Sequence, residues 1–131
     1  MIAVSFVNTY GYRPLHIDLG QYQCDVPAAE GLSTTGCQQI ASDIGYCQSK
    51  GVKVLLALGG CVDKECGGDY TFQTSQQAND TASAVWSTYL SSTNNASVPA
   101  GSTERPFGTA YFDGVVLDVG TYVCASEFVT R

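Results

Sequence analysis

Three apolar runs separated by two amphipathic segments organise the chain. The runs cover residues 2–7, 52–58 and 111–119 and are rich in valine, isoleucine, leucine and aromatic residues, which is typical of strands. Between the runs, apolar side chains recur at helical spacing from about residue 35 and again from about residue 74. The order strand, helix, strand, helix, strand predicts an α/β fold with parallel strands joined by right-handed crossovers.

Both predicted helices carry boundary signals. Thr35 with Gln38, and Thr74 with Gln77, have the spacing of a capping box. Gly51 follows the first helix as a stop signal. The apolar faces are formed by two sets of residues: Ile40, Ile44 and Cys47 in the first helix, and Ala78, Ala82, Val85, Trp86, Tyr89 and Leu90 in the second. This spacing favours a core position for Trp86 and Tyr89 over a sugar-binding platform.

The remaining segments are predicted to be loops. Asn8 to Gly11 is a cluster of turn residues, and a polar, tyrosine-rich stretch follows it to about residue 34. Residues 91–106 are rich in Ser, Thr, Asn, Pro and Gly. The run Val52–Leu58 is nearly continuous and ends at two glycines, so we expect a strand covered on both faces.

Composition excludes some classes of partner. Six Lys and Arg against twelve Asp and Glu give a net charge of −6. A chain without a basic patch is not expected to bind nucleic acid. The apolar runs are far shorter than the ~18 residues of a membrane span, so we expect no membrane partner.

Cysteine content, low charge and two glycosylation sequons together indicate a secreted protein. The 131 residues include six cysteines, and sequons begin at Asn79 and Asn95. Residues 1–14 do not resemble a signal peptide, because they begin as a strand without a basic start. We therefore expect an extracellular protein whose N-terminal residues are missing from this chain. A zinc site is disfavoured because His16 is the only histidine and the cysteines lack paired ligand spacing.

The carboxyl ends of the predicted strands are the place to look for a site, since parallel α/β folds bind ligands there. Asn8, Gly59, Gly60, Asp118 and Gly120 lie at these ends. The glycines would let a ligand approach the backbone, although glycines of this kind often only end strands. A dinucleotide or phosphate site is disfavoured, because neither a G-x-G-x-x-G nor a G-K-[ST] motif is present.

Three segments resemble a known family in their order along the chain. Cys47 to Gly60, with the sequence CQSKGVKVLLALGG, resembles strand three of the class III endochitinases of glycoside hydrolase family 18. Glu104–Phe107 followed by Phe112–Asp118 resembles their approach to strand four, and Ile2–Asn8 resembles strand two. The resemblance implies a partial (β/α)8 barrel that contains parallel strands two to four only. It covers residues 1–119 as a partial catalytic domain and leaves 120–131 as an unmatched tail.

The resemblance also assigns roles within the strand-four motif Asp-Gly-x-Asp-x-Asp-x-Glu. In the family, the final Glu is the general acid, and the Asp two residues before it orients the N-acetyl group of the substrate, which attacks the anomeric carbon. Asp113 matches the first Asp, and Asp118 matches the orienting Asp. Val116 replaces the second Asp, and Gly120 replaces the acid Glu. Because glycine has no proton to donate, the resemblance implies an inactive chain. Asp113 could instead be a structural hydrogen-bonding residue.

The family also suggests pairings for the cysteines. A disulfide between Cys24 and Cys37 matches a family disulfide in the loop after strand two. Cys47 resembles a helix cysteine whose partner lies in the missing N-terminal segment. Cys61 and Cys66 span a short loop and could form a local disulfide, whereas Cys124 lies in the unmatched tail.

These observations predict a defective copy or fragment of a chitinase, an enzyme class that hydrolyses β-1,4-linked N-acetylglucosamine polymers. The alternatives are a non-catalytic chitin- or oligosaccharide-binding protein and a remnant without a sugar role. The expected partner is chitin or a chitooligosaccharide, without a cofactor. Tyr10, Tyr12 and Tyr22 lie where aromatic rings could stack on sugars. We also expect self-association through the open edges of strands 2–7 and 111–119.

Overall fold

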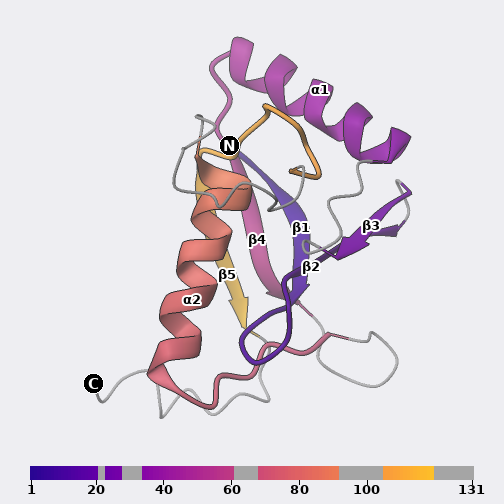
Figure 1. Ribbon diagram of the computed structural model, residues 1–131. Helices are drawn as coiled ribbons and strands as arrows, with labels where there is room; N and C mark the ends of the chain where they lie inside the picture. Colours follow the sequence, from indigo (N-terminus) through magenta and orange to yellow (C-terminus); the bar gives the residue numbers. More distant parts are fainter. Residues whose placement is uncertain (21–22, 28–33, 61–67, 92–104, 120–131) are drawn as a thin grey trace.

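The computed structural model describes residues 1–20, 23–27, 34–60, 68–91 and 105–119. These residues form a sheet of five strands in the order β3-β2-β1-β4-β5, together with two helices (Figure 1). The strands are β1 (Ile2–Thr9), β2 (His16–Leu19), β3 (Cys24–Pro27), β4 (Val54–Gly60) and β5 (Gly114–Val119). The helical segments are α1 (Thr35–Ser49), α2 (Ser75–Val85) and its π-helical continuation η3 (Trp86–Leu90).

The central part of the sheet follows the predicted alternation of strands and helices. β1 pairs in parallel with β4, and β4 pairs in parallel with β5. α1 connects the first pair, and α2 with η3 connects the second. In Figure 1, α2 runs in the direction opposite to β4 and β5, as a crossover helix does. The α/β class predicted from the sequence is therefore confirmed.

An antiparallel hairpin corrects the prediction of parallel strands only. β2 pairs antiparallel with β1 and with β3, so the sheet is mixed. The hairpin lies in the stretch predicted to be a polar loop, where His16 and Asp18 alternate with the buried Ile17 and Leu19. Because β2 covers part of β1, the outer strands of the described sheet are β3 and β5. The prediction that β1 is an edge strand was wrong, whereas self-association through β5 stays a prediction.

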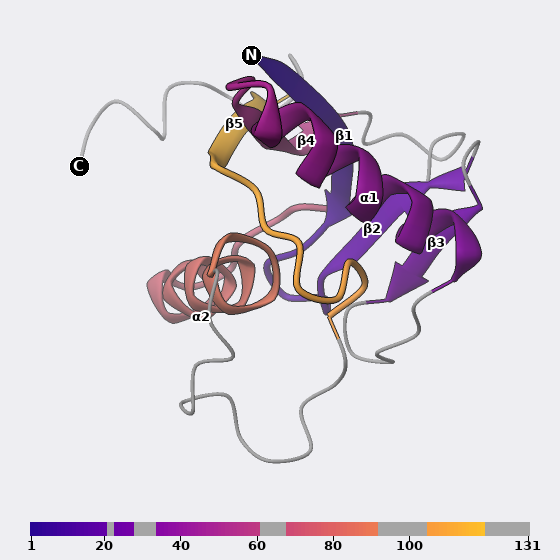
Figure 2. The ribbon, with the colours of Figure 1, turned by 90° about the horizontal axis from the view of Figure 1, so that it is seen from above.

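The core lies between the sheet and the helices (Figure 2). Leu56 of β4 and Tyr89 of η3 are 0% exposed, and Phe112 before β5 is 1% exposed. The rings of Tyr89 and Phe107 pack against Phe112 in edge-to-face or tilted arrangements. Ile40 and Ile44 bury the predicted face of α1. The apolar pattern thus identified the core-facing side of this helix correctly.

Two helix details differ from the sequence prediction. The N-cap of α1 is Thr34, whose hydroxyl accepts a hydrogen bond from the Cys37 amide, so the predicted capping box of Thr35 with Gln38 was wrong. The capping box at Thr74 is present. Trp86 is 58% exposed, which corrects its predicted core position. The helix widens to π geometry at Trp86, so the α-helical spacing of 3.6 residues per turn no longer applies there. Trp86 therefore does not share the buried face of Tyr89.

The third predicted strand is shorter than its apolar run. β5 begins at Gly114 rather than at residue 111, and all residues from Val115 to Val119 are exposed. Within the described residues, no helix is long and apolar enough to span a membrane.

Candidate functional site

The carboxyl ends of the parallel strands bring four predicted site residues together. Gly59 and Gly60 end β4 and pair with Asp118 and Val119 of β5. Asn8 lies near the end of β1, one residue beyond the pairing of Val7 with Leu58. Asn8, Gly59, Gly60 and Asp118 therefore share one end of the sheet, as the sequence predicted. We refer to this end as the carboxyl edge.

The strand register decides which way Asp118 faces. Ala57 pairs with Val116, and Gly59 pairs with Asp118. Because side chains alternate along a strand, Val116 and Asp118 lie on the sheet face of Ala57 and Gly59. Leu56 and Leu58 lie on the opposite face of the sheet, which packs against the helices and forms part of the core. Asp118 is exposed, so a carboxylate stands accessible at the carboxyl edge.

The two glycines permit close packing at this edge. Both have positive φ angles, +119° at Gly59 and +89° at Gly60. A Cβ atom on Gly59 would lie 2.0 Å from the Asp118 carbonyl oxygen, and one on Gly60 would lie 3.0 Å from the Phe6 ring. Side chains at either position would therefore displace β5 or Phe6. This geometry gives both glycines a structural role, and contact with a ligand is a further role that remains a prediction.

Asn8 is held by neighbours that the sequence did not reveal. Its side-chain amide donates to Asp18 Oδ2 at 3.4 Å, and its carbonyl oxygen accepts from the Asp69 amide at 2.9 Å. The Tyr10 amide then donates to the Asp69 carbonyl, and the Tyr12 amide donates to the Thr71 carbonyl. The segment after β1 and the segment from Asp69 to Thr71 thus lie side by side and build one wall of the carboxyl edge.

An aromatic cluster follows these two segments. Tyr10 is 5% exposed and stacks on Tyr70 with ring centroids 5.3 Å apart. Burial, with the negative charge of an ionised Tyr70, raises the pKa of Tyr10 to about 12. The Tyr70 hydroxyl donates to the Gly60 carbonyl at 3.0 Å. Since Tyr10 is buried, its ring supports the edge and is not available for the sugar stacking that the sequence left open.

Tyr12 is the more exposed aromatic residue. Its hydroxyl donates to Asp69 Oδ2 at 2.5 Å, and this hydrogen bond is the main reason that the pKa of Asp69 is lowered. The Arg13 guanidinium lies over one face of the Tyr12 ring and donates to Asp69 at 3.1 Å. One ring face of Tyr12 is therefore covered. Tyr22 lies outside the described residues.

Asp113 lies at the opposite end of the strands from Asp118. Its Oδ2 atom accepts hydrogen bonds from the Val54 amide at 2.9 Å and the Gln48 side-chain amide at 3.1 Å. Its Oδ1 atom accepts from Lys53 Nζ at 2.8 Å. The hydrogen bond from Lys53, followed by that from the Val54 amide, lowers the pKa of Asp113 from 3.8 to about 2. These contacts fit the alternative in which Asp113 is a structural hydrogen-bonding residue.

The cysteines and sequons are placed as follows. The predicted disulfide between Cys24 and Cys37 is present and joins β3 to α1. Cys47 is free and partly exposed in the part of the chain that the structure describes. Asn79 is exposed on α2. Cys61, Cys66, Asn95, Gly120 and Cys124 lie outside the described residues. Across the described ranges, no group of three or more His, Cys, Asp or Glu residues is placed to hold a metal ion.

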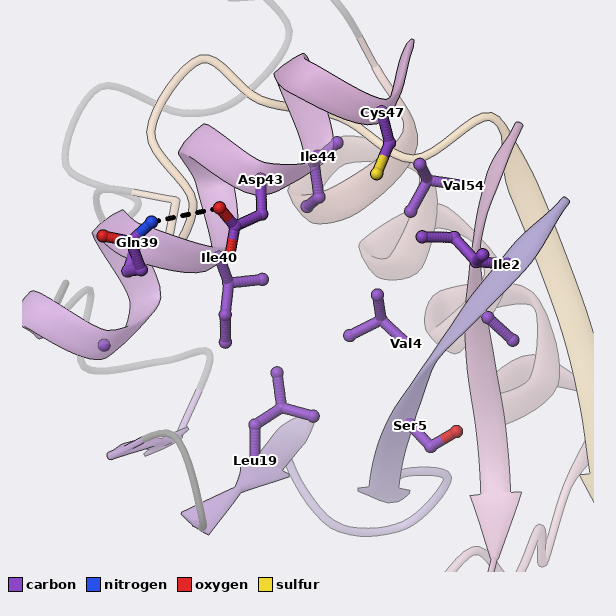
Figure 3. A pocket seen from close by; sticks show the side chains of 12 residues that line it. Ile2, Val4, Ser5, Leu19, Gln39, Ile40, Asp43, Ile44, Cys47 and Val54 are labelled. Carbon is purple, nitrogen blue, oxygen red and sulfur yellow. Dashed lines mark hydrogen bonds between the residues drawn. The ribbon is translucent and has the colours of Figure 1, made fainter. Parts of the chain in front are cut away.

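A separate pocket lies between α1 and the amino-terminal half of β1 (Figure 3). Its volume is about 450 Å³, and Val4, Leu19, Ile40 and Ile44 form much of its lining. The Cys47 side chain also reaches this pocket. The pocket lies at Ile2 to Ser5 rather than at Asn8, and its lining is mainly apolar. It is therefore distinct from the carboxyl edge, and its polar side chains, Ser5, Gln39 and Asp43, lie among mainly apolar residues.

Comparison with known proteins shows clear relatives, although no family model matches the chain. The chain is 33% identical over 119 residues to an acidic endochitinase of Cicer arietinum, covering 90% of this chain and 34% of the relative. It is 35% identical over 114 residues to the xylanase inhibitor protein XIP of Oryza sativa subsp. japonica, covering 87% of this chain and 31% of the relative. The chain thus spans about a third of the length of these relatives.

A solved structure shows the same relationship in three dimensions. The xylanase and alpha-amylase inhibitor protein XAIP-II from Scadoxus multiflorus aligns with a TM-score of 0.64 and 28% identity. The alignment covers 90% of this chain and 35% of that structure. An inhibitor protein therefore shares this arrangement of strands and helices, and an endochitinase is similar to the chain in sequence.

Proposed function

This chain is a homologue of the endochitinases and xylanase inhibitor proteins of glycoside hydrolase family 18, over about a third of their length. We propose that it is a chitinase-derived protein that binds N-acetylglucosamine oligosaccharides without hydrolysing them. On this proposal, the parallel strands β1, β4 and β5 correspond to strands two to four of a (β/α)8 barrel, and the β2–β3 hairpin lies outside that set. Residues 1–119 carry the family resemblance, and residues 120–131 form the tail beyond it.

The observation that carries this proposal is the position of Asp118. It lies at the carboxyl edge, exposed, on the same sheet face as Gly59, where the family motif requires the carboxylate that orients an N-acetyl group. A carboxylate accepts hydrogen bonds from an amide N–H, and these charge-assisted bonds are stronger than neutral ones. Asn8 adds a side-chain amide at the same edge, which can donate to sugar hydroxyls. Asp118 and Asn8 are thus the proposed sugar-binding residues.

The proposed absence of hydrolysis follows from the residues at two motif positions. Gly120 stands where the family has its acid Glu, and Val116 stands where it has the preceding Asp. Without a proton donor at the leaving oxygen, the chain lacks a contribution of roughly 10²–10⁴ to the rate. Asp118 cannot replace the acid because it has a different role in the substrate-assisted reaction, so its remaining role is binding.

Hydrolysis and binding can be measured on the same preparation. A fluorogenic chitooligosaccharide is incubated with the purified chain, with a complete family chitinase as a positive control. N-acetylchitotetraose is titrated into the chain by calorimetry, with cellotetraose as the control sugar that lacks N-acetyl groups. We expect binding of the first sugar only, and turnover at least about a hundredfold below that of the complete enzyme. Turnover within about tenfold of the control enzyme would contradict the proposed inactivity.

The inhibitor relatives support a second candidate, a protein that binds another glycoside hydrolase. The rice relative is named a xylanase inhibitor protein, and XAIP-II is titled a xylanase and alpha-amylase inhibitor protein. Addition of the chain to xylanase and amylase assays tests this candidate. Inhibition in the absence of sugar binding would favour it over the oligosaccharide-binding proposal.

Extracellular location belongs to the same proposal. The disulfide between Cys24 and Cys37 requires oxidising conditions to persist. Glycosylation is proposed at the exposed Asn79 and at Asn95. Expression in a secreting eukaryotic host followed by glycosidase treatment and mass measurement tests it. An unchanged mass after treatment would contradict the glycosylation.

A further inference from the structure

β5 is held in the sheet by less packing than its neighbours. Val115, Val116, Leu117 and Val119 are between 39% and 60% exposed, although they are apolar. In the adjacent strand β4, Val54 and Leu56 are 0% exposed. In the described part of the sheet β5 pairs with β4 alone. A strand whose two faces are both exposed has little in its apolar pattern to fix its register.

The register of β5 nevertheless matters at the carboxyl edge. Gly59 pairs with Asp118, which places the carboxylate on the face of Ala57 and Gly59. A shift by one residue would turn every side chain of β5 to the opposite face. It would place Leu117 or Val119 where Asp118 now lies. Some feature other than burial must therefore select the observed pairing.

The start of β5 carries a polar clamp that can make this selection. The Asp113 amide donates to the Val54 carbonyl at 2.8 Å, and the Val54 amide donates back to Asp113 Oδ2 at 2.9 Å. The same carboxylate accepts from Gln48 at the end of α1 and from Lys53, which precedes β4. The carboxylate therefore joins three elements at one point, directly before the first pair of the ladder, Leu55 with Gly114.

We propose that Asp113 is a positioning residue that sets the register of β5 against β4 and thereby places Asp118 at the carboxyl edge. It acts at the far end of the strand and does not touch a ligand there. A shifted strand would offer the Val54 amide the backbone or side chain of Gly114 or Phe112 instead, neither of which carries a carboxylate. The role of Asp118 in sugar binding rests on the proposed function, whereas the register itself does not.

Amide exchange and cross-strand NOEs measured by NMR test the register directly. In Asp113→Ala, we expect loss of the contacts between Leu56 and Val115 and an exchange rate at least about tenfold faster for amides shared by β4 and β5. The amides shared by β1 and β4 should change by less than about twofold. Asp113→Asn keeps one oxygen for the Val54 amide and should fall between the wild type and the alanine variant.

Two control variants separate the clamp from a general effect of charge. Asp80→Ala removes an exposed carboxylate of α2 that accepts only a hydrogen bond from Gln76 in the described structure. Asp43→Ala removes an exposed carboxylate of α1 that accepts a hydrogen bond from Gln39 and does not contact the clamp. Both variants should leave the pairing of β5 unchanged. Intact β4–β5 contacts with exchange rates within about twofold in Asp113→Ala would overturn the proposal.

The remaining outcomes also decide between positioning and general stability. If Asp113→Ala does not fold, the amide exchange rates of Asp113→Asn are compared with those of the wild type in both strand pairs. Equal acceleration of exchange in the β1–β4 and β4–β5 pairs would overturn the proposal. N-acetylchitotetraose affinity should fall at least about tenfold in Asp113→Ala, with partial rescue in Asp113→Asn. If the wild type itself does not bind this sugar, the proposed function fails, and the NOE pattern still decides the role of Asp113.

Discussion

The neighbouring strands β4 and β5 are held in place by different means. β4 lies between β1 and β5, and four of its residues, Leu56, Ala57, Leu58 and Val54, are no more than 8% exposed. β5 is also mainly apolar, but its side chains are exposed and its start is fixed by the carboxylate of Asp113. Apolar composition therefore identifies a strand without showing whether packing or polar contacts will hold it.

The largest expected difference comes from equal truncations in the two strands. Leu56→Ala removes a fully buried side chain from β4 and should lower the free energy of unfolding by about 2–5 kcal/mol. Leu117→Ala in β5 removes a side chain that is 60% exposed. This substitution should change the free energy of unfolding by no more than about 0.5 kcal/mol. Urea denaturation of both variants gives the comparison. Equal losses would show that β5 is as well packed as β4.

The sequence predicted the well-packed part of the molecule and missed the parts held by polar contacts. The pattern of residues 52–58 identified β4 because burial on both faces leaves a continuous apolar run. The β2–β3 hairpin was missed because only two apolar residues, Ile17 and Leu19, alternate within its short first strand. Trp86 was misplaced because a π-helical turn is not visible in helical spacing.

The candidate site was predicted in the same uneven way. Asn8, Gly59, Gly60 and Asp118 were found because each follows or ends an apolar run at the same edge of the sheet. Asp69 and its contacts with the segment after β1 were missed, since its partners, backbone groups as well as the side chains of Tyr12 and Arg13, are far away in the sequence. The separation of Asp113 from Asp118 follows from the length of β5.

The disulfide is expected to have the next largest effect. Cys24 and Cys37 are 13 residues apart in sequence, and a bridge that closes a loop of this size contributes about 2–4 kcal/mol. The double variant Cys24→Ser/Cys37→Ser should lose that amount in urea denaturation. Wild-type chain under reducing conditions is the matched control. A loss below about 0.5 kcal/mol would show that packing alone holds the hairpin against α1.

A smaller change is expected at the buried tyrosine of the core. No described residue offers a hydrogen bond to the Tyr89 hydroxyl, and burial raises the pKa of this tyrosine. Removing an unpaired buried polar group while retaining the ring relieves a desolvation cost of about 1–3 kcal/mol. Tyr89→Phe should therefore raise the free energy of unfolding by about 1 kcal/mol. A decrease in thermal and chemical stability would reveal a partner for the hydroxyl.

The smallest effect is the pH dependence of the Asp113 clamp. The folded state lowers the pKa of Asp113 from 3.8 to about 2, so its ionised form is favoured by folding. Its contribution to stability is complete above the ordinary pKa and is lost as the pH falls toward 2. The stability difference between wild type and Asp113→Asn should therefore shrink between pH 5 and pH 2, as measured by urea denaturation. A constant difference over this range would contradict an ionised clamp.

The most direct test of the account is sugar binding by an Asp118 variant. N-acetylchitotetraose is titrated into the wild type, Asp118→Ala and the control Asp25→Ala, while backbone amides are followed by NMR. We predict that shifts in the wild type gather at Asn8, Gly59 and Asp118, and that Asp118→Ala weakens binding at least about tenfold, because it removes a charge-assisted hydrogen bond. Asp25→Ala should bind as the wild type does. Unchanged affinity in Asp118→Ala, or shifts confined to residues away from the carboxyl edge, would contradict the assignment of this edge as the sugar site.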